Sequence, residues 1–160
     1  IEQFKGLGAS AMVLPFGELY TSLQNGVIDG QENPLDIIER MKFFEVQKHV
    51  LVTNHGENVQ VIFFNPGWWK KLPGSYRGVI RSAFMIESAA VERGKTDDAA
   101  KSLEFIKTAG LNVRIASEAE RDKIRELAYP PARDAYIAMA GEEGRRLIAL
   151  YEKELAARGK

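Results

Sequence analysis

The chain has 160 residues, of which 45% are apolar and 28% are charged, which is typical of a globular domain and excludes a disordered or collagen-like chain. Its 22 basic and 22 acidic residues balance, which disfavours nucleic acid or an anionic membrane surface as the partner, because both attract a basic excess. The absence of cysteine excludes disulfides, thiolate metal sites and a cysteine nucleophile, and no apolar run approaches the ~18–20 residues of a membrane span.

The first residues, 1–8, have the pattern of the last turns of a helix that ends at a glycine. No Ser, Thr, Asp or Asn precedes them as a helix cap, and no signal peptide is present. We therefore expect the C-terminal part of a longer protein, and the alternative is a trimmed or disordered terminus.

Short strands and helices alternate in the first half of the chain. Apolar runs predict strands at 11–14, 27–28, 49–53 and 58–64. Helices are predicted at 16–25, from Asn33-Pro34 and from Asn65-Pro66, where Asn would cap the helix and Pro would take its first position. This alternation predicts α/β architecture.

A long helix is expected to open the second half. Ser75 would cap it, and it would run to about Ala109 with apolar residues on one face. Gly110 would end it before a short strand at 111–115.

The end of the chain is expected to be helical. Ser117 and Glu120 have the spacing of a capping box, which marks a helix start. Pro130 and Pro131 are expected to break the chain, and helices would follow at 133–140 and 142–158.

The polar residues that could bind a ligand lie in residues 15–33, in loops that follow two predicted strands. Ligands of open α/β sheets bind at the carboxyl ends of strands. Phe16 and the group Gln31-Glu32-Asn33 lie at those ends, and an aromatic ring beside amide and carboxylate groups suits a small polar ligand. Core packing alone would also explain Phe16, and helix capping alone would explain Asn33.

Catalytic motifs are absent from the sequence. It contains no HExxH zinc motif, GxSxG elbow, GxxxxGK[ST] phosphate loop or GxGxxG fingerprint. Asp29, Glu32 and His55 could form an acid–base group, but structural hydrogen bonding is the simpler interpretation. Trp68 and Trp69 could stack on a sugar ring, although adjacent helical residues face different ways, so one of them is expected in the core.

Five sequence blocks carry a resemblance through their order and spacing. They are LGAS at 7–10, PFGELY at 15–20, LQNGVIDGQENP at 23–34, FEVQK at 44–48 and TNH at 53–55. They closely resemble the substrate-binding proteins of tripartite ATP-independent periplasmic (TRAP) transporters, of the dicarboxylate-receptor type. The resemblance covers essentially the whole chain, is densest in 7–55, and beyond 75 is mainly one of pattern.

The resemblance implies the C-terminal part of a two-domain, periplasmic-binding-protein-like α/β fold with long C-terminal helices. Residues 1–55 would form part of the second ligand-binding lobe and a hinge strand. Residues 56–160 would supply the remaining strands, a long bracing helix and the C-terminal helices, and the N-terminal half of the family fold would be absent. The family's carboxylate-pairing Arg would lie upstream, since Arg40 and Arg77 are expected at exposed helix positions.

The resemblance also implies a function and roles for four residues. Asn33 would hydrogen-bond the ligand, Phe16 would pack on it, and Glu32 and His55 would join a water-linked polar network. The protein would be a periplasmic receptor, with its signal peptide removed. It would bind a dicarboxylate, keto acid or sugar acid in an interdomain cleft and deliver it to the TRAP membrane permease subunits.

No catalytic residue, cofactor or metal ligand is implied, although a metal bridges the ligand in some relatives. Two alternatives stay open. The receptor fold could be reused as a ligand-sensing or interaction module, or the protein could be a hydrolase that uses Glu32 and His55.

Overall fold

The structure is a computed structural model that describes residues 1–56, 59 and 61–158. The chain forms two compact units. Unit 1 comprises Ile1–Phe16, Val52–His55 and Ile115–Lys160, and unit 2 comprises Gly17–Leu51 and Gly56–Arg114.

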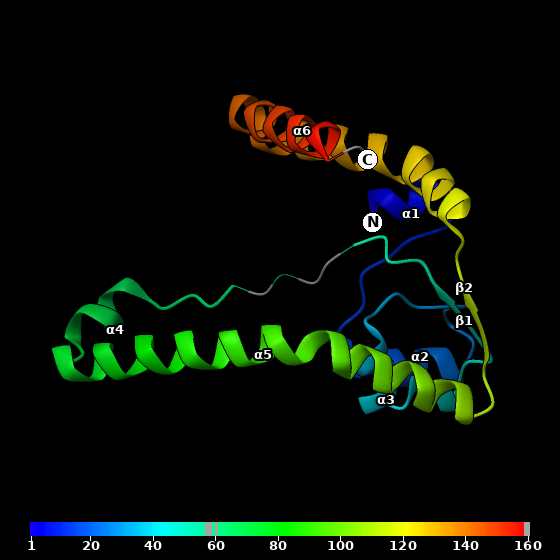
Figure 1. The fold of residues 1–160 in the computed structure, drawn as a ribbon, viewed down its shortest axis with the longest axis horizontal. Helices are drawn as coiled ribbons and strands as arrows, with labels where there is room; N and C mark the ends of the chain where they lie inside the picture. Colours follow the sequence, from blue (N-terminus) through cyan, green and yellow to red (C-terminus); the bar gives the residue numbers. More distant parts are fainter. Residues whose placement is uncertain (57–58, 60, 159–160) are drawn as a thin grey trace. The chain divides into compact units, whose positions relative to one another are not determined.

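Unit 2 is built mainly from helices that follow one another along the chain (Figure 1). They are the short 3-10 helix η1 (Phe16–Glu18, whose first residue belongs to unit 1), α2 (Leu19–Gln24), α3 (Leu35–Arg40), the 3-10 helix η2 (Phe43–Glu45), α4 (Pro66–Lys71) and the long α5 (Gly74–Thr108). Leu23, Ile38, Phe43 and Ile106 form the buried core, in which Phe43 and Ile106 are 0% exposed. The core therefore fixes α2, α3 and η2 against the C-terminal end of α5.

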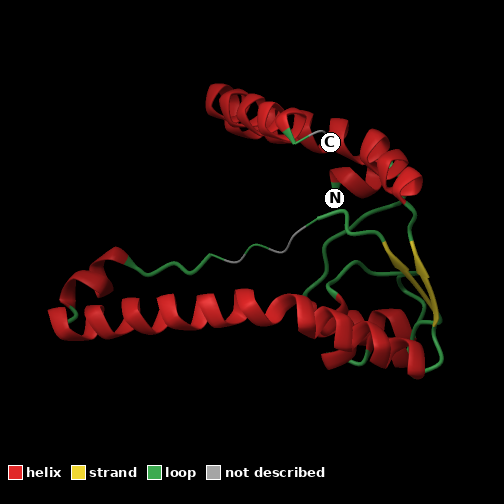
Figure 2. Cartoon of the chain, viewed as in Figure 1, coloured by secondary structure: helices red, strands yellow, loops and turns green. Residues whose placement is uncertain are grey.

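Two short strands, β1 (His49–Val52) and β2 (Asn112–Ile115), pair with each other (Figure 2). The N–H of Asn112 donates to the carbonyl of Lys48, and the N–H of Ala116 donates to the carbonyl of Val52, both at 2.9 Å. Because the register advances by four residues on both strands, the pair is parallel. The boundary between the units falls inside each strand, so both strands carry the chain from unit 2 into unit 1.

Unit 1 consists of α1 (Glu2–Gly6) packed on α6 (Glu118–Ala157). The predicted capping box opens α6, with the side chain of Ser117 accepting from the N–H of Glu120. Gly141, at φ 61° and ψ −137°, divides α6 into two helical arms. The arms fold back on each other, since the hydroxyl of Tyr129 donates to Glu152 at 3.0 Å. No helix of the described ranges combines the length and hydropathy that membrane crossing requires.

Three of the predicted strands are wrong. Residues 11–14, 27–28 and 61–64 form no strand, while residues 58 and 60 lie outside the described residues. Val13, Val27 and Phe63 are 77%, 69% and 86% exposed. A strand needs a hydrogen-bonded neighbour, and within the described ranges only β1 and β2 supply one. An apolar run alone therefore did not predict a strand.

The helix boundaries also differ at two places. The cap of α5 is Pro73 and not Ser75, because the helix already begins at Gly74. Pro130 and Pro131 lie inside α6, and the break comes at Gly141. Both prolines keep helical backbone angles despite the donors that they remove, whereas the angles of Gly141 lie outside the helical region. The break does fall between the two predicted helices, 133–140 and 142–158.

Candidate functional site

The four predicted ligand residues fall in both units. Phe16 and His55 belong to unit 1, and Glu32 and Asn33 belong to unit 2. Glu32 and Asn33 are neighbours in the loop before α3, where the side chain of Glu32 is exposed and that of Asn33 is half-buried.

Asn33 does not cap α3, and the prediction that it would is wrong. Pro34 is the N-cap residue, with ψ 151°, and no side chain bonds to the first turn. Asn33 therefore lies one residue too early to act as the cap. Its Nδ2 instead donates to Oε1 of Gln31 at 2.6 Å.

The second Asn-Pro pair behaves as predicted. Oδ1 of Asn65 accepts from the N–H of Trp68 at 3.1 Å, and Pro66 takes the first helical position of α4. The Asn-Pro pair therefore caps α4 through Asn65, whereas before α3 the amide of Asn33 is available for another contact.

A chain of three amides runs through this part of unit 2. Nε2 of Gln31 donates to Oε1 of Gln47 at 3.2 Å, so Gln47, Gln31 and Asn33 are linked in sequence by side-chain hydrogen bonds. All three side chains are half-buried. Gln47 lies between η2, which the buried Phe43 anchors, and β1. We call these three residues the amide chain.

The sequence did not predict the link between Gln47 and Gln31. Gln47 appeared only as one letter of the block at 44–48, because nothing in the local pattern connects it to Gln31, 16 residues away. The left-handed backbone of Lys42 (φ 57°) and the short helix η2 bring the chain back toward the loop that carries Gln31.

In unit 1, His55 has two neighbours that orient its ring. Its Nδ1 lies 2.6 Å from Oγ1 of Thr53, and its ring meets the Phe4 ring edge-on, with centroids 5.6 Å apart. Asn54, with φ 50°, turns the chain between Thr53 and His55. Phe16 is 47% exposed at the start of η1, which is more than core packing alone predicts.

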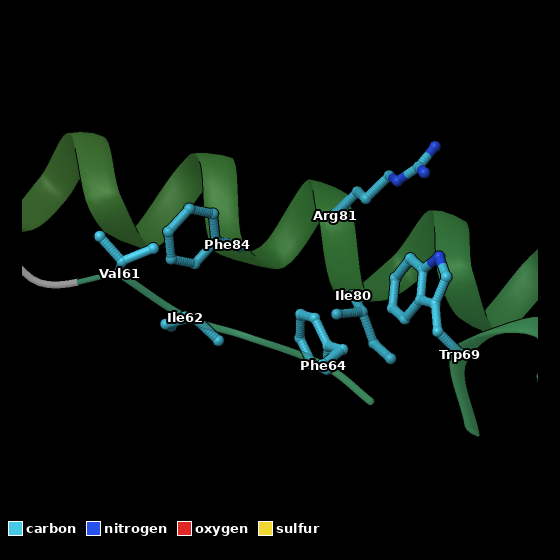
Figure 3. A pocket seen from close by; sticks show the side chains of 7 residues that line it. All are labelled: Val61, Ile62, Phe64, Trp69, Ile80, Arg81 and Phe84. Carbon is cyan, nitrogen blue, oxygen red and sulfur yellow. The ribbon is translucent and has the colours of Figure 1, made fainter. Parts of the chain in front are cut away.

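A hollow in unit 2 is lined by other residues. A groove of about 420 Å³ separates the segment 61–64 from α5 (Figure 3). It is lined by Val61, Ile62, Phe64, Trp69, Ile80, Arg81 and Phe84. The guanidinium of Arg81 lies 5.5 Å from the centre of the Trp69 ring. This lining is mainly apolar and contains none of the predicted ligand residues.

The tryptophan pair packs on an aromatic neighbour rather than dividing between core and solvent. The Phe64 ring lies 4.9 Å from Trp69 and 5.8 Å from Trp68, measured between centroids. Trp68 is 48% exposed and Trp69 is half-buried. The expectation that one of the two lies in the core is therefore wrong, because the core of unit 2 sits at the other end of α5.

The two arginines of residues 1–80 differ in their exposure. Arg40, the last residue of α3, is exposed as predicted, whereas Arg77 on α5 is half-buried. Among the residues that the structure describes, no three His, Asp or Glu side chains gather as metal ligands.

Comparisons with known proteins agree on one family. The model of the bacterial extracellular solute-binding proteins, family 7, matches residues 1–138. The sialic acid-binding periplasmic protein SiaP of Vibrio cholerae is 36% identical over 131 residues, covering 71% of this chain and 40% of SiaP. The C4-dicarboxylate-binding periplasmic protein DctP of Rhodobacter capsulatus is 34% identical over 142 residues, covering 88% of this chain and 42% of DctP.

Solved structures give the same result. The crystal structure of a TRAP periplasmic solute-binding protein from Desulfovibrio salexigens, with bound orotic acid, is 50% identical and superposes with a TM-score of 0.89. The match covers 98% of this chain and 50% of that protein, so the chain spans about half the length of the relatives it matches. The fold is therefore a partial α/β binding-protein fold, and the chain belongs to the bacterial extracellular solute-binding proteins, family 7.

Proposed function

We propose that this chain is part of a periplasmic receptor that binds a small organic acid and delivers it to a TRAP-type membrane permease. One observation carries the proposal, namely the 50% identity and TM-score of 0.89 to a TRAP solute-binding protein across 98% of the chain. The family consists of solute-binding proteins, and we propose that this member too binds its ligand without chemical change.

The ligand class follows from the relatives. SiaP is named for sialic acid, DctP for C4-dicarboxylates, and the Desulfovibrio protein holds orotic acid. All three are carboxylic acids, so a dicarboxylate, keto acid or sugar acid is the proposed ligand. A guanidinium pairs with a carboxylate through two parallel donors. We propose that the Arg that pairs with the ligand's carboxylate in this family lies outside the chain.

Four residues are proposed to contact the ligand or its waters. Asn33 would hydrogen-bond the ligand, which its freedom from helix capping supports. Phe16 would pack on it, which fits a ring that is 47% exposed. Glu32 and His55 would form the polar network, and the contact of His55 Nδ1 with Thr53 would orient the ring for it.

The domain assignment is also a proposal. Residues 1–55 would contribute part of the second lobe and a hinge strand, and residues 56–160 would supply the remaining strands, the bracing helix and the C-terminal helices. The parallel pair of β1 and β2, which carries the chain twice between units, supports hinge strands. We propose that the exposed apolar segment 61–64 is covered by the half of the fold that lies outside this chain.

Ligand binding by the complete natural protein tests the proposal. A thermal-shift screen would use orotate, N-acetylneuraminate, succinate and 2-oxoglutarate, with neutral analogues as controls. An acid at about 100 times its dissociation constant adds about 2.7 kcal/mol to the folded state, which is a shift of several degrees. A shift with one acid and not with its neutral analogue is expected.

Further results would contradict the proposal in different ways. Turnover of the bound acid, followed by NMR, would favour the hydrolase alternative. If the protein binds an acid but deletion of the permease leaves the uptake of that acid unchanged, a sensing module would be favoured. No shift with any acid would contradict the proposed ligand class.

A further inference from the structure

We propose that Gln31 and Gln47 are positioning residues that hold the amide of Asn33 in the orientation that recognises the ligand. This inference rests on the proposed function, because it assigns the ligand contact to Asn33. The amide chain supplies the evidence, with Asn33 Nδ2 bonded to Gln31 at 2.6 Å and Gln31 Nε2 bonded to Gln47 at 3.2 Å.

The amide chain is anchored at both ends by the core. Asn33 precedes α3, whose Ile38 is 6% exposed in the core of unit 2. Gln47 follows η2, whose Phe43 is 0% exposed in the same core, and precedes β1. An amide held from such fixed points keeps one rotamer, so less side-chain entropy is lost when a ligand binds to it.

The direction of the hydrogen bonds defines what Asn33 can offer. A primary amide has two N–H donors and one carbonyl acceptor. One donor is used toward Gln31. Oδ1 and the second donor have no partner among the described residues, and neither bonds to the first turn of α3. An acceptor beside a donor matches a ligand that carries a carbonyl next to an N–H or O–H group.

The inference therefore deepens the ligand class. Orotate carries ring N–H groups beside carbonyls, whereas succinate at neutral pH has acceptors only. A site that places an acceptor against the ligand discriminates against an analogue without the donor, because the acceptor stays unpaired once the bound ligand has displaced water from it. We expect the amide chain to matter more for an acid of the orotate kind than for a plain dicarboxylate.

Calorimetry on the complete natural protein tests this with matched variants. Gln31→Met and Gln47→Met keep the side-chain length and remove the hydrogen bonds. Gln24→Met, at the exposed end of α2, is the control. Loss of one hydrogen bond predicts roughly three- to tenfold weaker orotate binding for Gln31→Met, a smaller loss for Gln47→Met and none for the control.

A double variant separates positioning from general damage. If Gln31 acts through Asn33, the variant that combines Gln31→Met with Asn33→Ala binds no more weakly than Asn33→Ala alone. An additive further loss would overturn the inference. The inference would also be overturned if Asn33→Ala weakened the binding and Gln31→Met did not. That outcome would leave the proposed function intact.

A second measurement does not depend on any ligand. In the free protein, the side-chain amide signal of Asn33 in ¹⁵N-resolved NMR should shift when Gln31 becomes Met and stay unchanged in the Gln24→Met control. An unchanged Asn33 signal in Gln31→Met would overturn the inference even if no acid of the panel binds. Normal orotate binding by Asn33→Ala would contradict the proposed site, while the NMR result still decides whether the amide chain exists.

Discussion

Replacing Gly141 by Ala should destabilise the protein, and replacing Gly94 by Ala should stabilise it. Gly141 has φ 61° and ψ −137°, in a region that a residue with a Cβ rarely adopts. The strain costs about 1–3 kcal/mol, and the reduced entropy of the unfolded chain offsets about 0.4–1 kcal/mol of it. Gly94 lies inside α5, and its added Cβ would meet only Asp98 Oδ2, at 3.7 Å. There, Ala gains about 0.5–1 kcal/mol in helix propensity.

Thermal unfolding followed by circular dichroism at 222 nm measures both variants against the parent. For a protein of this size, 1 kcal/mol corresponds to roughly 2–4 °C in Tm, so Gly94→Ala should raise the Tm by about 1–4 °C, while Gly141→Ala, with a net cost of up to about 2.6 kcal/mol, should lower it. If Gly141→Ala raised the Tm as Gly94→Ala does, α6 would have to be continuous through residue 141, and the division into two arms would be refuted.

Three further predictions concern single side chains. Phe43→Ala should cost about 3–5 kcal/mol of the free energy of unfolding, because the ring is fully buried, whereas Met139→Ala, at a 79% exposed position, should stay within about 0.5 kcal/mol in urea unfolding. Asn65→Ala should cost about 1 kcal/mol through loss of a helix cap, whereas Asn65→Asp, whose carboxylate also caps, should stay close to the parent in denaturant unfolding; equal losses for the two variants would contradict the cap. Burial, with a hydrogen bond to a carboxylate, raises the pKa of Tyr129 from 10.0 to about 12, so stability should be full below pH 10 and decline as the pH rises toward 12. Tyr129→Phe should remove that part of the decline, which pH-dependent unfolding checks.

Features whose cause is local were predictable from the sequence. The capping box at Ser117 and the cap at Asn65 each depend on residues within one helical turn, and both are confirmed. The strand at β1 was also found. The runs at 11–14 and 61–64 were not strands, because strand formation depends on a partner that the run does not specify.

The candidate site shows the same limit more sharply. Asn33 and Asn65 precede proline in the same way, yet only Asn65 caps a helix. The difference lies in where each helix begins, at Leu35 after Pro34 in α3 and at Pro66 directly after Asn65 in α4. Gln47 joins Gln31 across 16 residues, a contact that no local pattern encodes. Sequence and family resemblance could therefore nominate Asn33, but only the fold could supply its supporting residues.

The amide chain can contribute to ligand recognition but not to proton transfer. Gln31, Gln47 and Asn33 carry amides, which neither gain nor lose a proton in the pH range of the periplasm. They can orient a bound molecule, but none of them can act as a general acid or base, and the hydrolase alternative would depend on Glu32 and His55 instead. These three residues should therefore add no pH dependence to the affinity for an acid. The sensing module would use the same chemistry, so it is the partner and not the ligand contact that separates it from the transport receptor.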